Sequence, residues 1–278
     1  MEIISIWKAI LLGAVQGASE FLPISSSGHL VIFQQWLGLG KEGEFLLAFD
    51  VALHFGTLVA VLYYFREDLR LLILSVLKPG MPVEKKGEAD FAPQDARRIA
   101  LYLILGTLPA IFVGLTFKSF FEMLFADTFS ASFCIMITGG LLWWTRKFAQ
   151  GGIGFDRMTQ KHSWCIGIAQ AVAILPGISR SGSTMVAGLF LGLRPEVVAQ
   201  FSFLLSIPAI AGAVILEIPH LMALTWGALL PILFGTLASF FVGYASIRWL
   251  LGIIQRGHLH YFAWYLWIFG AVAFISQI

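Results

Sequence analysis

The sequence predicts an all-α, multi-pass integral membrane protein. Of its 278 residues, 58% are hydrophobic and only 12% are charged, with a mean hydropathy of +0.84, whereas soluble chains carry about a quarter charged residues. Two polar inserts each interrupt a long apolar run near its middle, and further apolar runs approach or exceed the roughly 20 residues that a spanning helix needs. We therefore expect a single membrane domain over residues 1–278.

The two polar inserts run from Ser19 to His29 and from Ile174 to Thr184. Non-helical backbone at membrane depth is tolerated only where it is buried in protein or lines a wet cavity. We expect each insert to be the turning point of a re-entrant hairpin of two half-helices, with Pro23 and Pro176 ending the first half-helices. The flanking apolar pieces are too short to cross a membrane, at residues 10–18, 30–39, 166–173 and 185–193.

Longer apolar segments follow each hairpin and are expected to span the membrane. Between the first two, we expect residues 66–94 to form a solvated loop that contains the charged run Glu84–Glu88. Lys118–Met123 is expected to be a short turn, Gln150–Gly154 a flexible linker, and Glu217 a solvent-facing residue at the end of a span. The expected spans are Phe45–Phe65, Ile99–Phe117, Leu124–Thr145, Val198–Leu216, Trp226–Leu250 and His260–Ser276.

The second half of the chain repeats the plan of the first. Gly13–Gln16 resembles Gly167–Gln170, and Leu22-Pro23 resembles Leu175-Pro176. Each half holds one hairpin and three spans, an odd number, so the halves would enter the membrane with opposite orientation. This predicts two inverted-topology repeats, about 1–147 and about 160–278, with a midplane site between them. Chance similarity between Gly- and Ser-rich membrane segments is the alternative.

Basic residues predict the orientation, because cytoplasmic loops collect Lys and Arg. The expected topology places only Lys8, Lys41 and Lys118 on one side. We therefore expect both termini and the mouth of the first hairpin on the outer side of a bacterial cytoplasmic membrane. The opposite side collects Arg66, Arg70, Lys78, Lys85, Lys86, Arg97, Arg98, Arg146, Lys147, Arg157, Lys161, Arg194, Arg248 and Arg256.

The inserts carry ionisable residues that are expensive at membrane depth and are therefore candidates for function, namely Glu20, His29 and Arg180. Helix N-termini capped by hydroxyls suit a phosphate, and a guanidinium binds phosphate oxygens in pairs. The alternative is that Arg180 pairs with Glu20 to neutralise a buried charge. The other residues expected to bind the anion are Ser25, Ser27, Gly28, Ser179, Ser181, Gly182, Ser183 and Thr184.

Gln16 and Glu20 lie four residues apart, so they share one face of a half-helix. Their oxygens suit Mg²⁺ or Ca²⁺, and Mg²⁺ is usually bound by few carboxylates together with substrate phosphates. Glu20 could instead act as a base. Ser26 and His29 are the candidate nucleophiles, because transfer through a covalent intermediate needs an activated hydroxyl or imidazole.

Asp50 and His54 form another pair four residues apart, inside a predicted span. They either orient the groups that contact substrate or hold two helices together. Cys134 and Cys165 have no metal-type spacing and are expected to be packing residues. The net charge of +2 gives no reason to expect a nucleic acid partner.

The stretches Gln16–His29 and Pro176–Thr184 resemble the two signature motifs of bacterial undecaprenyl-diphosphate phosphatases, the bacitracin-resistance proteins. The resemblance covers essentially the full length and implies removal of the terminal phosphate from undecaprenyl diphosphate, which recycles the cell-wall carrier lipid, with a divalent cation. By motif position, Glu20 would be the catalytic or metal-binding carboxylate and Arg180 the phosphate clamp, while Ser26 and His29 are the nucleophile candidates. Some members carry Glu at the position of Gln16, so this chain does not support a mechanism that needs two carboxylates there.

A secondary transporter or lipid flippase with the same midplane site is the alternative function, and a structural scaffold is a third. The expected partners are a polyprenyl diphosphate and membrane lipid. The sequence leaves open whether the nucleophile is His29, Ser26 or a water activated by Glu20. It also leaves open which metal is bound, which prenyl chain length is preferred and whether the protein flips lipid. The oligomeric state is open as well, and a homodimer is one possibility.

Overall fold

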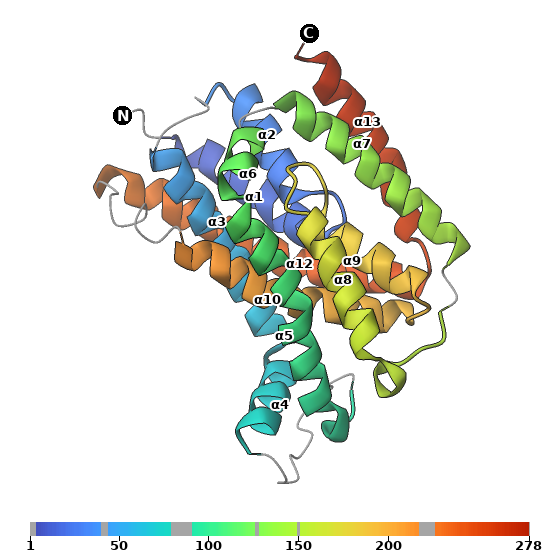
Figure 1. Cartoon of the computed structure of the whole chain (residues 1–278). Coiled ribbons are helices and arrows are strands. Elements are labelled where there is room, and N and C mark those ends of the chain that lie inside the picture. Colours follow the sequence, from blue (N-terminus) through green and yellow to red (C-terminus); the bar gives the residue numbers. More distant parts are fainter. Residues whose placement is uncertain are drawn as a thin grey trace.

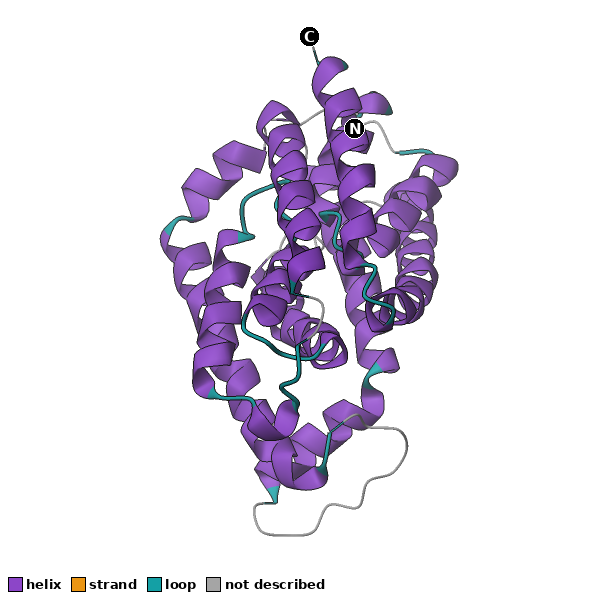
Figure 2. Cartoon of the chain, turned by 90° about the vertical axis from the view of Figure 1, so that its right-hand side faces the viewer, coloured by secondary structure: helices purple, strands orange, loops and turns teal. Residues whose placement is uncertain are grey.

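The computed structural model describes residues 4–39, 44–78, 91–125, 128–148, 151–216 and 226–277. Within these residues every named element is a helix (Figure 2), which confirms the predicted all-α class. The α-helices are α1 Ile6–Phe21, α2 Ser26–Trp36, α3 Glu44–Tyr64, α4 Arg66–Leu77, α5 Pro93–Thr116, α6 Lys118–Phe125, α7 Thr128–Trp144, α8 Gln160–Val172, α9 Arg180–Phe190, α10 Pro195–Leu216, α12 Leu229–Gln255 and α13 Phe262–Ile275. The short 3₁₀ helices are η1 Thr145–Lys147, η2 Phe155–Arg157, η3 Trp226–Ala228 and η4 Leu259–Tyr261.

Five helices in the described part of the chain are long and apolar enough to cross a membrane. They correspond to the first five predicted spans, so the multi-pass architecture is confirmed. The sixth predicted span, His260–Ser276, forms the apolar segment Leu259–Ile275, which is shorter than these five helices. The long segments are Phe45–Tyr64, Pro93–Thr116, Thr128–Lys147, Pro195–Leu216 and Leu229–Gln255.

Both predicted breaks are present. The helices on either side of them, α1 and α2 in the first half and α8 and α9 in the second, have 16, 11, 13 and 11 residues. Each is shorter than the roughly 20 residues that span a bilayer. Both chain termini lie at the same end of the molecule, and α4 lies at the opposite end (Figure 1).

Two segments that we expected to be irregular are helical. Residues 66–77 of the predicted loop form α4. Leu71 and Leu72 of this helix are buried. On its surface, the Glu67 carboxylate lies near the Arg66 and Arg70 side chains. Five of the twelve residues of α4 are polar and suggest a loop, but the apolar ones recur at helical spacing. The predicted Lys118–Met123 turn forms α6. The run Glu84–Glu88 and Glu217 lie outside the described residues.

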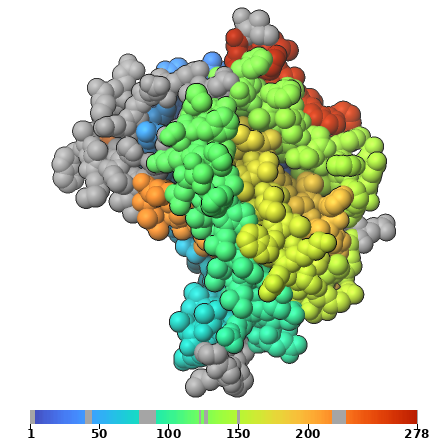
Figure 3. Space-filling view, viewed as in Figure 1, coloured from blue at the N-terminus to red at the C-terminus, as the bar shows by residue number. Residues whose placement is uncertain are grey.

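In each half of the chain, the first half-helix of the hairpin packs closely against a long helix of the other half. The helix α1 packs along α12, and α8 packs along α5; the latter pair is visible as adjacent yellow and green surfaces in Figure 3. A Cβ atom added at Gly13 would collide with the carbonyl oxygen of Gly235, and one added at Gly167 would collide with that of Gly106. In each case a glycine allows one helix backbone to approach another closely, and the inverted repeat stays a prediction.

Replacing Gly13 by Ala is expected to destabilise the protein by about 1 to 3 kcal/mol, the usual effect of overpacking, because the backbone of Gly235 leaves no room for a methyl group. The same change at Gly140 is the matched control, since nothing lies within 4 Å of a Cβ there. Melting temperatures in detergent measure both effects. Equal melting temperatures for the two variants would contradict the close contact between α1 and α12.

Candidate active site

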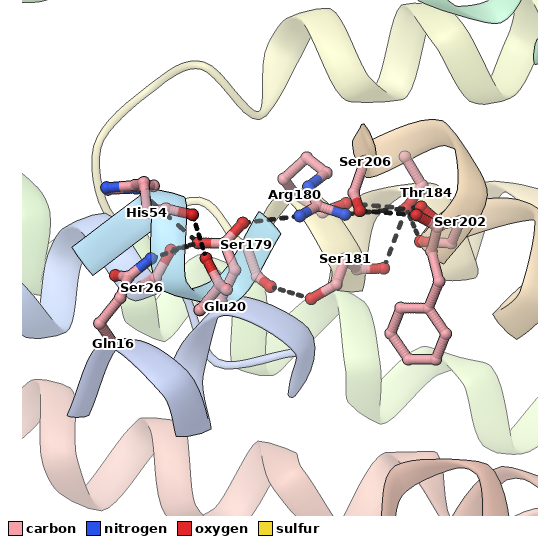
Figure 4. A network of polar contacts seen from close by, with 12 residues as sticks. Gln16, Glu20, Ser26, His54, Ser179, Arg180, Ser181, Thr184, Ser202 and Ser206 are labelled. Carbon is pink, nitrogen blue, oxygen red and sulfur yellow. Dashed lines mark hydrogen bonds and ion pairs between the residues drawn. The ribbon is translucent and has the colours of Figure 1, made fainter. Parts of the chain in front are cut away.

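The two polar inserts meet in the interior, as Figure 4 shows. The Ser181 hydroxyl donates a hydrogen bond to the carbonyl oxygen of Leu22 over 3.0 Å. A Cβ atom added at Gly28 would lie 3.0 Å from the Cα atom of Gly177. The turn of one hairpin therefore touches the turn of the other, and residues that are far apart in sequence share one site.

Serine caps start both returning half-helices, as predicted. The Ser25 hydroxyl accepts a hydrogen bond from the Gly28 amide over 3.3 Å, and the Ser179 hydroxyl accepts one from the Gly182 amide over 3.1 Å. Because α2 and α9 both begin at the meeting point of the inserts, the positive ends of two helix dipoles lie close together there. Such an arrangement favours a phosphate or another anion.

Glu20 is the centre of the hydrogen-bond network. The Glu20 side chain is 6% exposed, and its Oε2 atom accepts hydrogen bonds from the Ser26 hydroxyl over 2.6 Å and from the Gln16 amide over 3.0 Å. The predicted shared face of Gln16 and Glu20 is thus confirmed by a direct contact. At this distance, the Glu20 carboxylate is placed to accept the proton of the Ser26 hydroxyl.

Arg180 binds the other oxygen of the same carboxylate. Its Nη2 atom donates to Oε1 of Glu20 over 2.7 Å, and its Nη1 atom lies 3.5 Å from the carbonyl oxygen of Ser202. The structure therefore contains the ion pair that was the alternative for Arg180, and this pair does not exclude a role in binding phosphate. The guanidinium side chain is 15% exposed, and it lies at the start of α9, beside the two helix N-termini.

His29 faces a different part of the protein. Its Nδ1 atom lies 2.8 Å from the carbonyl oxygen of Ser25, and its Nε2 atom lies 2.8 Å from the hydroxyl of Tyr265. The ring also stacks on Phe269 with the centroids 4.2 Å apart. Both nitrogens thus have partners, and neither of those partners is Glu20.

His54 lies beside the carboxylate, with its Nε2 atom 3.8 Å from Oε2 of Glu20. Its Nδ1 atom lies 2.8 Å from the carbonyl oxygen of Asp50. The Asp50 carboxylate accepts a hydrogen bond from Gln34 over 2.7 Å. Of the two residues predicted as a pair, the structure brings His54 to Glu20, whereas the Asp50 side chain joins α3 to α2.

The remaining predicted residues form a shell of hydroxyls around the turns. Ser27 lies 3.4 Å from the Ser25 hydroxyl, and Ser181 lies 3.2 Å from the Ser179 hydroxyl. Thr184 contacts the hydroxyl of Ser202 over 2.6 Å. Ser183 carries a buried hydroxyl oxygen that has no hydrogen-bond partner in the described residues.

The sequence alone did not point to Tyr265, Phe269, Gln34 or Ser202. Tyr265 is 236 positions away from His29 along the chain, and aromatic residues are common in apolar spans. Only the folded chain brings these side chains to the inserts.

The fold and the site together define a class: a polytopic α-helical membrane protein that brings a buried carboxylate, a serine hydroxyl and an arginine together where two broken helices meet. The family model of bacitracin resistance protein BacA matches residues 9–272. The chain therefore belongs to the BacA family, and it is a multi-pass inner-membrane protein.

Curated relatives agree with this assignment over nearly the whole chain. A protein of Methanobrevibacter smithii is 42% identical over 98% of this chain and 97% of its own length. A protein of Desulfatibacillum aliphaticivorans is 43% identical over 97% of this chain and 98% of its own length. A protein of Desulfosudis oleivorans is 41% identical over 95% of this chain and 96% of its own length. Each of these relatives is named undecaprenyl-diphosphatase.

Proposed function

We propose that this protein is an undecaprenyl-diphosphate phosphatase. It hydrolyses undecaprenyl diphosphate to undecaprenyl phosphate and phosphate, and so recycles the carrier lipid of cell-wall synthesis. The observation that carries the proposal is the buried Glu20 carboxylate, which holds the Ser26 hydroxyl at 2.6 Å on one oxygen and Arg180 at 2.7 Å on the other. The relatives' shared name supports the same activity.

Ser26 is the nucleophile that this geometry supports best. The Ser26 oxygen attacks the terminal phosphorus, its proton passes to Glu20, and the bond to the lipid phosphate breaks as undecaprenyl phosphate leaves. Water then hydrolyses the phosphoserine and releases phosphate. A water activated by Glu20 and attack by His29 are the alternatives, but the His29 nitrogens already contact Ser25 and Tyr265.

Arg180 and the starts of α2 and α9 stabilise the negative charge of the diphosphate. The guanidinium is already inside the site, so it needs no large movement to reach phosphate oxygens. Preorganised donors of this kind are among the largest contributions to catalysis. The Glu20 carboxylate holds Arg180 in place through Oε1 before substrate binds, and the His54 ring nitrogen lies near the other oxygen, Oε2.

The residues around Glu20 fit a divalent cation, Mg²⁺ or Ca²⁺. The Oε1 atom of Gln16 is buried and has no hydrogen-bond partner among the described residues, and the Gln16 amide nitrogen contacts Glu20 directly. No group of three or more His, Cys, Asp or Glu in the described ranges could hold a metal, so substrate oxygens would complete the ligands beside Glu20 and Gln16. When bound, the cation neutralises charge on the phosphates.

The basic loops and the shared side of the termini support an outer-facing site. α4, with Arg66 and Arg70, lies at the end opposite both termini in Figure 1, and the excess of basic residues makes that end cytoplasmic. The isoprenoid tail would remain in lipid beside the apolar spans. A homodimer is compatible with this placement, and the proposal involves no nucleic acid.

We expect the purified protein in detergent to release phosphate from undecaprenyl diphosphate, because hydrolysis needs no sealed bilayer. Chelation with EDTA should stop the release, and Mg²⁺ or Ca²⁺ should restore it. A colorimetric phosphate assay, with binding of the lipid measured in parallel, tests both statements. A folded protein that binds the lipid diphosphate but releases no phosphate would contradict the proposal and favour the transporter alternative.

A further inference from the structure

His29 is held by contacts that fix which of its nitrogens carries a hydrogen. Nδ1 lies 2.8 Å from the carbonyl oxygen of Ser25. A carbonyl oxygen only accepts hydrogen bonds, so Nδ1 must donate. In the neutral imidazole, Nε2 is therefore unprotonated and accepts the hydrogen bond from the Tyr265 hydroxyl, 2.8 Å away.

Ser25, whose carbonyl oxygen contacts Nδ1 of His29, has an unusual backbone conformation. Ser25 has φ of 72° and ψ of 97°, and it is the non-glycine residue with positive φ among those described. Such a conformation costs about 1 to 3 kcal/mol and persists only where neighbouring contacts enforce it. The Ser25 carbonyl accepts from both the His29 amide and the His29 ring, so His29 holds the carbonyl of this residue from two directions.

The Ser25 turn directly precedes Ser26, whose hydroxyl lies 2.6 Å from Glu20. The position of Ser25 therefore determines where the Ser26 hydroxyl lies. His29 is 2% exposed, and its ring is nearly parallel to that of Phe269, at an interplanar angle of 7°. Phe269 and Tyr265, both on α13, leave the imidazole little freedom to rotate.

We propose that Tyr265 is a positioning residue that acts through His29 on the strained Ser25 turn and thereby aims Ser26 at Glu20. The Tyr265 hydroxyl donates to Nε2 and Nδ1 donates to the Ser25 carbonyl, so the two contacts together hold the imidazole in the orientation that keeps the Ser25 carbonyl in place. The last helix of the chain thus sets the geometry of the first insert. This inference rests on the proposed function, in which Ser26 and Glu20 act on the diphosphate.

The direct test is ¹⁵N NMR of histidine-labelled protein, with the His29 signals assigned by their loss in His29→Asn. Wild-type protein should show His29 protonated on Nδ1 with a hydrogen-bonded, unprotonated Nε2. Tyr265→Phe should shift the Nε2 resonance and leave Nδ1 protonated. A wild-type hydrogen on Nε2 overturns the proposal without any variant and without an activity measurement.

Kinetics provide the second test. Tyr265→Phe removes one hydroxyl and keeps the ring, so we expect kcat to fall about tenfold while KM stays within about twofold, as for loss of a group that orients a catalytic one. Tyr63→Phe is the matched control, since Tyr63 lies on α3 and is 53% exposed. An unchanged kcat, or a rise in KM alone, overturns the positioning role.

The two proposals fail in different ways. If wild-type protein releases no phosphate, the proposed function fails, and the NMR measurement still decides whether the Tyr265 hydroxyl donates to Nε2 of His29. If wild-type protein is active and Tyr265→Phe is equally active, the function stands and the positioning role is wrong.

Discussion

Replacing Glu20 by Gln is expected to lower the rate of phosphate release by about 10²- to 10⁴-fold, the usual contribution of a general base. The amide has almost the same shape as the carboxylate, but it cannot take the proton of the Ser26 hydroxyl. It also cannot hold Arg180 by charge. Initial rates with undecaprenyl diphosphate, at saturating lipid and cation, measure the loss.

The same substitution should also destabilise the fold by about 3 to 5 kcal/mol, because Arg180 would remain largely buried without its partner. Melting temperature must therefore be measured beside activity, at a temperature where the variant is folded. Glu67→Gln on α4 is the matched control, since the Glu67 side chain is 38% exposed and its ion pairs with Arg66 and Arg70, each at 3.9 Å, lie on the surface. A folded Glu20→Gln protein with wild-type rates would rule out Glu20 as the base.

Replacing Arg180 by Gln should lower kcat by about 10²- to 10³-fold, as for removal of a preorganised donor to a developing charge. We expect KM to rise as well, because the guanidinium would also contact the diphosphate in the ground state. Arg180→Lys should retain part of the activity, since it keeps the charge but loses the planar pair of donors. Steady-state kinetics of both variants measure the difference.

Arg157→Gln serves as the control for Arg180, because the Arg157 side chain is 67% exposed. The combined Glu20→Gln and Arg180→Gln variant provides a stability check. It leaves no unpaired buried charge, so it should be less destabilised than the sum of the single variants. Equal rates for Arg180→Gln and wild type would contradict a phosphate-binding role for Arg180.

Much of the architecture could be read from hydropathy. A short apolar run that ends at a proline cannot span a bilayer, so the breaks near Pro23 and Pro176 were visible in the sequence. Serine and glycine after each proline identified the helix starts, and the structure has Ser25 and Ser179 as caps. The sequence predicted a loop in place of α4 because the polar residues of this segment outnumber its two buried leucines, Leu71 and Leu72.

Local spacing also determined part of the site. Gln16 and Glu20 are four residues apart on one helix, and this spacing alone brings their side chains together. The cost of placing two charges at membrane depth indicates a pair between Glu20 and Arg180. Neither argument specifies the oxygen that each donor binds, because that depends on how the two hairpins dock.

The sequence by itself determined the membrane class, the two broken helices and the polar residues inside them, because these follow from helix length, proline geometry and the cost of burying charge. Only the tertiary structure decided which side chains meet. Arg180 reaches Glu20 across 160 positions, and Tyr265 reaches His29 across 236. Contacts of this range depend on the packing of α1 against α12 and of α7 against α13, and close helix packing depends on the shape of whole surfaces rather than on any local pattern.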